Sequence, residues 1–230
     1  ERQRLRLVTN GRRLVLLRHG RTAWNKERRM QGHADIPLDE IGQEQARRAA
    51  RVLAGMVPTA IISSDSVRAM ETAAALTEIT GVVPRYDARL RETHLGEWEG
   101  LSDVEVRSNF TQSWIDWHND ELDMAPPGGE ARSQVAARVS ECITETLEHL
   151  NDDRCTLVVV SHGAALRVGM ATLLRLPHNR WSALGGFANC AWSVLTEAID
   201  PVTGEAVAGR WRLAEHNAGS LPDVVLSDDK

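Results

Sequence analysis

The sequence predicts a three-layer α/β/α fold with a mainly parallel central sheet. Short apolar runs of strand length alternate along the chain with longer amphipathic segments, a pattern typical of parallel sheets covered by helices. The expected strands at 13–17 and 155–161 contain continuous apolar runs at 14–17 and 157–160, which indicates strands buried on both faces. These two observations carry the prediction.

The expected elements follow in order along the chain. After the first strand (13–17), a long loop reaches Pro37, and Asp39 can cap a helix that ends near Met56. The apolar face of that helix is expected to contain Ile41, Ala46, Ala49, Leu53 and Met56. The other expected elements are a strand at 59–64, a helix over 66–80 stopped by Gly81, a short strand at 83–87, weak helical periodicity over 102–120, an amphipathic helix over 130–150, a strand at 155–161, a helix over 163–174, and two edge strands at 190–196 and 210–215.

The chain is expected to form one domain over 13–217, between a basic flexible arm (1–12) and a C-terminal tail (218–230). The Pro/Gly stretch at 125–130 is the only candidate boundary. The motifs on its two sides are expected to work together, and neither half is self-sufficient, so a second domain is not expected.

Composition narrows the class of partner. The formal net charge of −5 argues against nucleic acid and anionic membranes as partners. No apolar run approaches the ~20 residues that span a bilayer, and the arginine-rich start lacks the apolar segment of a signal peptide. The three cysteines form no CxxC pair, so we expect them to be buried thiols in a reducing, cytoplasmic compartment.

Polar side chains follow three of the expected strands. They are Arg18-His19-Gly20, Ser63-Ser64 with Arg68 nearby, and Ser161-His162-Gly163. Because ligands of such sheets bind at the carboxyl ends of the strands, two arginines and two histidines are expected to converge there. This cluster suits a phosphoryl group, which arginine forks and the start of a helix at Gly163 can bind.

The reaction expected at such a cluster is phosphoryl transfer. A histidine can attack phosphorus, while arginines neutralise the equatorial oxygens. An acid must protonate the leaving oxygen. Glu92, shortly after the strand at 83–87, is the favoured candidate, and Glu97 and Glu99 are its rivals.

Five motifs in fixed order resemble the histidine phosphatase superfamily, in the branch that includes the cofactor-dependent phosphoglycerate mutases. They read "LRHG.T.WN", "QG..D.PL...G..QA", "SSD..RA.ETA", "RE..LGEWEG" and "VVSHG", and the resemblance covers roughly residues 13–217. Within the superfamily, "RETHLGEWEG", "WSALGGFANCAWSVL" and "RWRLAEHNAG" are most similar to glucosyl-3-phosphoglycerate phosphatases. Arg21 and "GGEARS" depart from the common family pattern without touching the chemistry.

The resemblance implies a role for each matched residue. His19 would be the phosphorylated nucleophile, and Glu92 the proton donor and then the base. Arg18, Arg68 and His162 would bind the phosphoryl group. Asn25 and Gln31 would contact phosphate or the leaving group, and Thr22, His94 and Gly163 complete the predicted substrate-binding set. The resemblance implies no metal and no organic cofactor, a small phosphorylated metabolite as substrate, and a homodimer.

Some of the other aromatic and histidine residues allow two interpretations. Trp114 and Trp117, with Phe110, form either a small satellite core or a lid in which 108–129 shapes the leaving-group pocket. His94 could also be a partner of the site or a plain surface residue. Trp98, Trp192 and Trp211 are expected to pack. Non-ligand roles are expected for His33, His118, His149, His178 and His216.

Three functions compete at this point. The leading one is a phosphomonoesterase that works through phosphohistidine, specific or broad in its substrates. A mutase would use the same residues, although the short segment between Glu92 and His162 favours hydrolysis. A non-catalytic phosphate-binding module is the third, because fold does not determine function.

Overall fold

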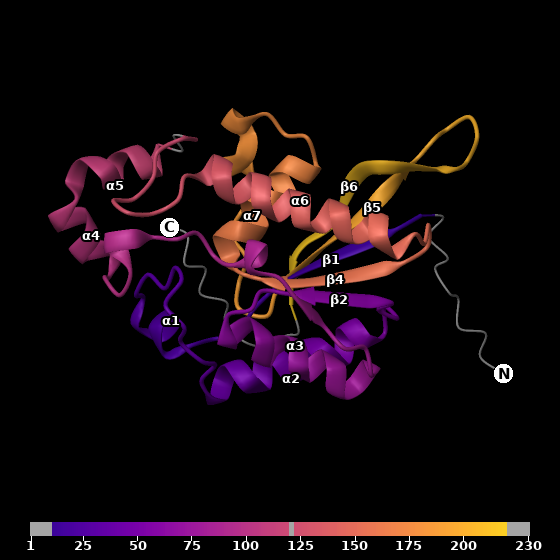
Figure 1. Ribbon diagram of the computed structural model, residues 1–230, viewed down its shortest axis with the longest axis horizontal. Helices are drawn as coiled ribbons and strands as arrows, with labels where there is room; N and C mark the ends of the chain where they lie inside the picture. The colour runs from indigo at the N-terminus through magenta and orange to yellow at the C-terminus, as the bar shows by residue number, and fades with distance from the viewer. Residues whose placement is uncertain (1–10, 120–121, 220–230) are drawn as a thin grey trace.

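A six-stranded sheet forms the centre of the computed structural model, which describes residues 11–119 and 122–219 (Figure 1). The strands lie in the order β3-β2-β4-β1-β5-β6. Their bounds are β1 (Arg13–Arg18), β2 (Ala60–Ser63), β3 (Arg85–Tyr86), β4 (Thr156–Ser161), β5 (Trp192–Ile199) and β6 (Ala206–Ala218). The helices are α1 (Ala23–Glu27), α2 (Glu40–Ala54), α3 (Val67–Thr80), α4 (Asp103–Asn109), α5 (Thr111–His118), α6 (Arg132–Leu150) and α7 (Gly163–Leu173), with 3₁₀ turns η1 (Ala88–Leu90), η2 (Gly96–Trp98) and η3 (His178–Ala183).

The mainly parallel character of the sheet is confirmed. β4 pairs in parallel with β1 on one side and with β2 on the other, and β3 is parallel to β2. β5 is antiparallel to β1, and β6 is antiparallel to β5. The prediction that both late strands are edges was wrong for β5, which pairs with β1 from Trp192 to Thr196, so that of these two strands β6 is the edge.

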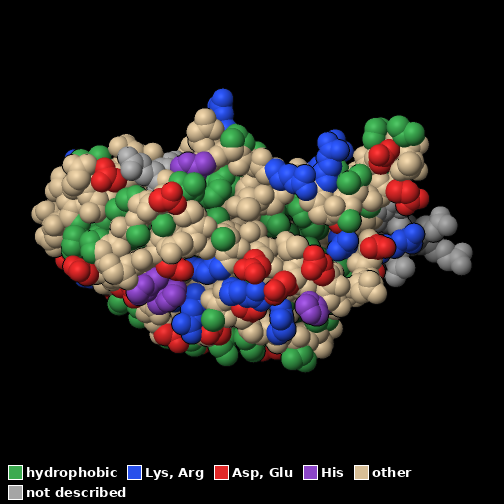
Figure 2. Space-filling view, turned by 45° about the horizontal axis from the view of Figure 1, so that its top comes forward, with side chains coloured by type: hydrophobic (Ala, Val, Ile, Leu, Met, Phe, Trp, Pro, Cys, Tyr) green, Lys and Arg blue, Asp and Glu red, His purple; other side chains and the backbone are tan. Residues whose placement is uncertain are grey.

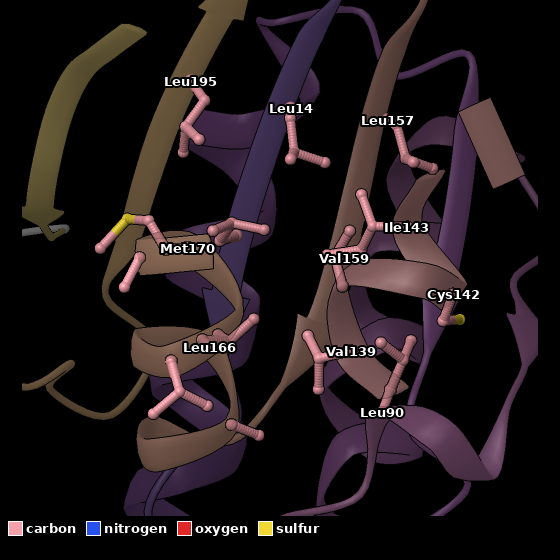
Figure 3. Packing of buried hydrophobic residues seen from close by; sticks show 14 of the residues in the cluster. Leu14, Leu90, Val139, Cys142, Ile143, Leu157, Val159, Leu166, Met170 and Leu195 are labelled. Atoms are coloured by element: carbon pink, nitrogen blue, oxygen red, sulfur yellow. The ribbon is translucent and has the colours of Figure 1, made fainter. Parts of the chain in front are cut away.

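Helices cover both faces of the sheet. Leu14 and Leu16 of β1 pack toward α6 and α7, and Val15 and Leu17 pack toward α2 and α3 (Figures 1 and 3). All four side chains are fully buried. The continuous apolar run in β1 thus serves two cores, because successive side chains of a strand point to opposite faces.

The face that α2 buries is the expected one at Ala46, Ala49 and Leu53, but not at Ile41. Asp39 caps the helix as predicted, accepting a bond from the Gly42 N–H at 2.8 Å. Ile41, however, is 45% exposed. The helix instead turns Gly42 against the backbone of Arg21, where a Cβ would lie 2.0 Å from the Arg21 carbonyl oxygen. This close approach fixes the rotation of α2 and turns Ile41 to solvent.

Three local features also depart from the expected pattern. The loop expected before Pro37 contains α1, whose start is a capping box of Thr22 and Asn25. The strand expected at 83–87 has only the two residues of β3, because Asp87 already caps η1. The weak periodicity over 102–120 corresponds to two helices, α4 and α5, separated at Phe110.

The expected arm and tail meet the fold at their inner ends. Arg12 is ion-paired to the buried Glu197 at 3.2 Å, so this residue belongs to the folded body and not to a flexible arm. Ala218 lies in β6. Residues 1–10 and 220–230, which make up most of both segments, lie outside the described residues.

The three cysteines are free and buried, as predicted. Burial raises the pKa of both Cys142 and Cys190 to about 12. Among the described helices, none combines the length and apolarity that a bilayer crossing requires.

Candidate active site

The ends of β1, β2 and β4 bring the predicted histidines and arginines together at one edge of the sheet. His19 directly follows β1 and His162 directly follows β4. Their ring centroids lie 5.1 Å apart with an interplanar angle of 62°. Arg18 and Arg68 are buried with them. Four residues from three distant parts of the chain therefore form one cationic, nearly solvent-free cluster.

His19 is held as a neutral ring with one nitrogen prepared for attack. Its Nδ1 lies 2.7 Å from the carbonyl oxygen of Gly20. A carbonyl can only accept, so Nδ1 carries the proton and Nε2 keeps its lone pair. Burial, and then the charges of Arg68 and Arg18, hold the pKa of His19 well below its usual value. The ring is therefore neutral and nucleophilic at neutral pH.

His162 has the opposite tautomer. The Nε–H of Arg68 donates to its Nδ1 at 3.2 Å, so the proton lies on Nε2, which donates to the Ser64 hydroxyl at 2.9 Å. Burial and the Arg68 charge hold the pKa of His162 well below its usual value as well. The Nε2–H of this ring can donate a hydrogen bond to an oxygen, but Nε2 has no lone pair with which to attack phosphorus.

Backbone carbonyls fix the two arginines in place. Arg68 donates from Nη1 to Ala34 at 2.7 Å and from Nη2 to Gly32 at 2.9 Å, and each of these nitrogens has a second N–H. Burial lowers the pKa of Arg68 to about 10, which leaves it charged at neutral pH. Arg18 donates to the carbonyl of Phe187.

The side chain of Arg18 lies beside the start of α7. A Cβ at Gly163 would lie 3.4 Å from the Arg18 Nε, which is an ordinary van der Waals distance. A guanidinium and a helix N-terminus therefore adjoin at the glycine predicted as a binding residue, where both favour an anion.

Glu92 lies at the same helix start. Its carboxylate accepts bonds from the N–H groups of Ala164 at 3.1 Å and Ala165 at 2.9 Å, within the first turn of α7, two to three residues after His162. Its rivals lie elsewhere: Glu97 is exposed, and Glu99 accepts from the His33 N–H at 2.8 Å. Of the three candidate carboxylates, Glu92 is the one fixed to the α7 N-terminus by hydrogen bonds from backbone N–H groups.

The other predicted substrate contacts form a hydrogen-bonded group beside His19. Thr22 donates to the Gln31 side-chain oxygen at 2.9 Å, and the Asn25 side-chain oxygen accepts from the Thr22 N–H at 3.1 Å. His94 lies further out, with its ring 4.8 Å from that of His33 and 3.7 Å from a Glu99 oxygen. The structure joins Thr22, Asn25 and Gln31 to one another and separates His94 from them.

Sequence reasoning missed residues that support the nucleophile. Asn189 donates to the carbonyl of His19 and to the Asn25 side chain, both at 3.2 Å. Thr72 accepts the Gly20 N–H at 3.1 Å. Asn189 comes near His19 only because β5 pairs beside β1, so its one sequence signal was its place in the "GGFANC" stretch.

Trp117 and Phe110 form a small satellite core with Trp98. Trp98 is fully buried, and its ring lies 5.8 Å from Trp117 and 6.3 Å from Phe110. Trp114 instead stacks on His118 at 3.9 Å. The expected packing of Trp98, Trp192 and Trp211 is confirmed by their burial.

Two further observations concern the charges on the surface and the question of a metal site. Figure 2 shows acidic, basic and histidine side chains interspersed over the face in view. Among the residues described, no three His, Cys, Asp or Glu side chains are grouped so that they could hold a metal ion.

Comparison with known proteins gives consistent matches. Glucosyl-3-phosphoglycerate phosphatase of Mycobacterium tuberculosis is 43% identical over 215 residues, which cover 91% of this chain and 96% of that protein. Probable phosphoglycerate mutase GpmB of Salmonella paratyphi C is 35% identical over 165 residues, 71% of this chain and 75% of the relative.

Solved structures agree. The mycobacterial glucosyl-3-phosphoglycerate phosphatase in complex with VO3 has a TM-score of 0.80 and 41% identity, covering 90% of this chain and 100% of that one. The complex of the same enzyme with inorganic phosphate has a TM-score of 0.79 and 40% identity, covering 91% and 98%. Residues 14–208 match the sequence profile of the histidine phosphatase superfamily, branch 1. With these matches and this strand-end cluster, the chain belongs to the histidine phosphatase superfamily.

Proposed function

We propose that this protein is a phosphomonoester hydrolase that works through a phosphohistidine on Nε2 of His19. The observation that carries the proposal is the pair of neutral histidines with opposite tautomers, 5.1 Å apart, between two buried arginines. One ring offers a lone pair to phosphorus, and the other would transfer its Nε2–H from the Ser64 hydroxyl to a phosphoryl oxygen.

The reaction has two steps in this proposal. In the first, the His19 Nε2–P bond forms as the bond from phosphorus to the alcohol oxygen breaks, and protonated Glu92 gives its proton to that oxygen. In the second, water attacks phosphorus, the N–P bond breaks, and Glu92 takes the proton of the water. Arg18, Arg68 and His162 bind the phosphoryl oxygens throughout.

We propose glucosyl-3-phosphoglycerate as the substrate. The support is the 43% identical relative and the two mycobacterial structures described above, which carry that enzyme name. Thr22, Asn25, Gln31 and His94 are the proposed contacts of the phosphate and the leaving group. A phosphatase of broad specificity is the closest alternative.

A screen of phosphorylated metabolites tests the substrate. Glucosyl-3-phosphoglycerate, 3-phosphoglycerate, sugar phosphates and α-ribazole phosphate are compared by phosphate release. The first is expected to have the highest kcat/KM. Similar values for all of them would favour the broad phosphatase, and no release from any would contradict the proposal.

A mutase assay tests the second candidate, which the likeness to the probable phosphoglycerate mutases favours. The protein is incubated with 3-phosphoglycerate and catalytic 2,3-bisphosphoglycerate. We expect phosphate release without isomerisation. Efficient formation of 2-phosphoglycerate with no phosphate released would establish the mutase instead.

Glu92 is tested by the acidity of the leaving group. Glu92→Gln is expected to lower kcat/KM for an alkyl phosphate by ~10²–10⁴-fold and to spare an activated aryl phosphate, whose phenolate leaves without a proton. Glu97→Gln, an exposed glutamate of the same segment, is the matched control and should leave both values unchanged. Equal losses on both substrates would remove Glu92 from the acid role.

Three features of the wider protein complete the proposal. The 108–129 segment, of which 120–121 lie outside the described residues, acts as a lid over the leaving group, supported by the contact of Trp117 in α5 with the buried Trp98. The protein is cytoplasmic, supported by three free buried thiols. It is a homodimer through the edge strand β6, a state that light scattering in solution tests directly.

A further inference from the structure

Arg138, on the second turn of α6, makes an unusual set of contacts beneath the segment that carries Glu92. Nη1 donates to the carbonyls of Arg89 at 2.7 Å and Arg91 at 2.6 Å. Nη2 donates to the carbonyl of Glu92 at 2.8 Å. One guanidinium thus binds three carbonyls within four consecutive residues.

The remaining donors of Arg138 bind a carboxylate. Nε donates to Glu130 Oε1 at 3.0 Å and Nη2 donates to Glu130 Oε2 at 2.8 Å. These five bonds use all five N–H groups of the guanidinium. Its side chain is only 17% exposed, so the contacts are shielded from water and hold one geometry.

Glu130 extends the same network beyond Glu92. Its Oε2 accepts the His94 N–H at 2.9 Å, and its own N–H donates to the His94 carbonyl at 2.8 Å. The chain is therefore held on both sides of Glu92, from Arg89 to His94. Glu92 itself then reaches across to the N–H groups of α7.

From this geometry we infer that Arg138, held by Glu130, is a positioning residue that aims the Glu92 carboxyl at the reacting phosphoryl group. The inference rests on the proposed function. The five hydrogen bonds of Arg138 go to backbone carbonyls and to Glu130, so it acts through Glu92. The apolar face of α6, with Val135, Val139 and Ile143 fully buried, packs into the core on its own account, so the arginine is not needed to place the helix.

The test is a double-mutant cycle between Arg138→Gln and Glu92→Gln, measured as kcat/KM on an alkyl phosphate and on an activated aryl phosphate. Misplacing a catalytic group by about 1 Å costs ~10²-fold, and we expect a loss of this size for Arg138→Gln on the alkyl phosphate alone. In the Glu92→Gln background, Arg138→Gln should cause no further loss. A further loss as large as in the wild type, or equal losses on both substrates, would overturn the inference.

Arg12→Gln is the matched control. Arg12 is also ion-paired to a carboxylate and is 15% exposed, but it lies at the opposite end of β1 from His19. It should leave both kcat/KM values unchanged. If Arg12→Gln lowered them as much as Arg138→Gln does, the effect would be general destabilisation and the positioning role would be refuted.

Amide hydrogen exchange separates this inference from the proposed function, because it needs no turnover. Arg138→Gln should speed exchange in 89–94 and leave β1 and β4 unchanged. If the wild type hydrolysed neither substrate, the proposed function would fail while this measurement still tested the contact. Unchanged exchange over 89–94 would refute the role of Arg138 whatever the activity.

Discussion

The ends of β1 and β4 place a histidine at the same edge of one sheet, and the two side chains differ in what their Nδ1 atoms contact. Nδ1 of His19 meets a carbonyl, and Nδ1 of His162 meets a guanidinium N–H. The first contact leaves a lone pair on Nε2, and the second leaves a proton there. The comparison teaches that one hydrogen bond on the far side of an imidazole decides whether it can act as a nucleophile or as a donor.

Removing the nucleophile should have the largest effect. His19→Ala is expected to lower phosphatase activity by at least ~10³-fold and to abolish the acid-labile phosphoprotein trapped by rapid quench. His162→Ala should slow turnover but still form the trapped species, because its Nε2–H only stabilises charge. A His19→Ala protein that still formed the phosphoprotein, or a His162→Ala protein that did not, would reverse the assignment of the two histidines.

Changing the guanidinium that orients His162 comes next. Arg68→Lys keeps a positive charge but removes the fork that donates to His162, Ala34 and Gly32. We expect a ~10²-fold loss in kcat/KM, the scale of one lost transition-state donor. Arg47→Lys, on the exposed side of α2, is the control and should be neutral. An Arg68→Lys enzyme with wild-type kcat/KM would show that the tautomer does not depend on this bond.

Removing the hydroxyl that faces the Nε2–H of His162 should have a smaller effect. Ser64→Ala deletes one neutral hydrogen bond of about 1 kcal/mol, which corresponds to roughly five-fold in kcat/KM. Ser66→Ala, whose hydroxyl neighbours Ser64 without reaching the histidine, serves as the control. A loss above 10²-fold on Ser64→Ala would place Ser64 among the catalytic groups.

The smallest expected effect is on stability against pH. Both histidines have a lowered pKa in the folded protein, so the unfolded chain binds protons first as the pH falls below ~6.5. Folding stability should therefore decrease from about pH 7 toward pH 5. Replacing either ring by Gln should flatten the change in Tm over that range. A Tm that falls as steeply in His19→Gln and His162→Gln as in the wild type would indicate that other groups dominate.

Much of the fold could be predicted because its signals are local. The apolar runs of β1 and β4 and the Asp39 cap of α2 need only neighbours in sequence. The exposure of Ile41 and the inner position of β5 could not be predicted in this way. The first depends on Gly42 meeting the backbone of Arg21, and the second on the pairing of β5 with β1.

The candidate site likewise has features that follow from the local sequence and others that depend on the tertiary structure. The sequence by itself determined which residue types follow each strand, namely Arg18-His19, Ser64 and His162, and hence a cationic edge suited to a phosphoryl group. Only the tertiary structure decided which ring carries its proton on Nδ1, and that Arg138 and Asn189 hold the site from behind. The physical reason is that a tautomer is set by hydrogen-bond partners within about 3 Å, and here Arg68 and Ser64 come from other elements of the fold than His162 does.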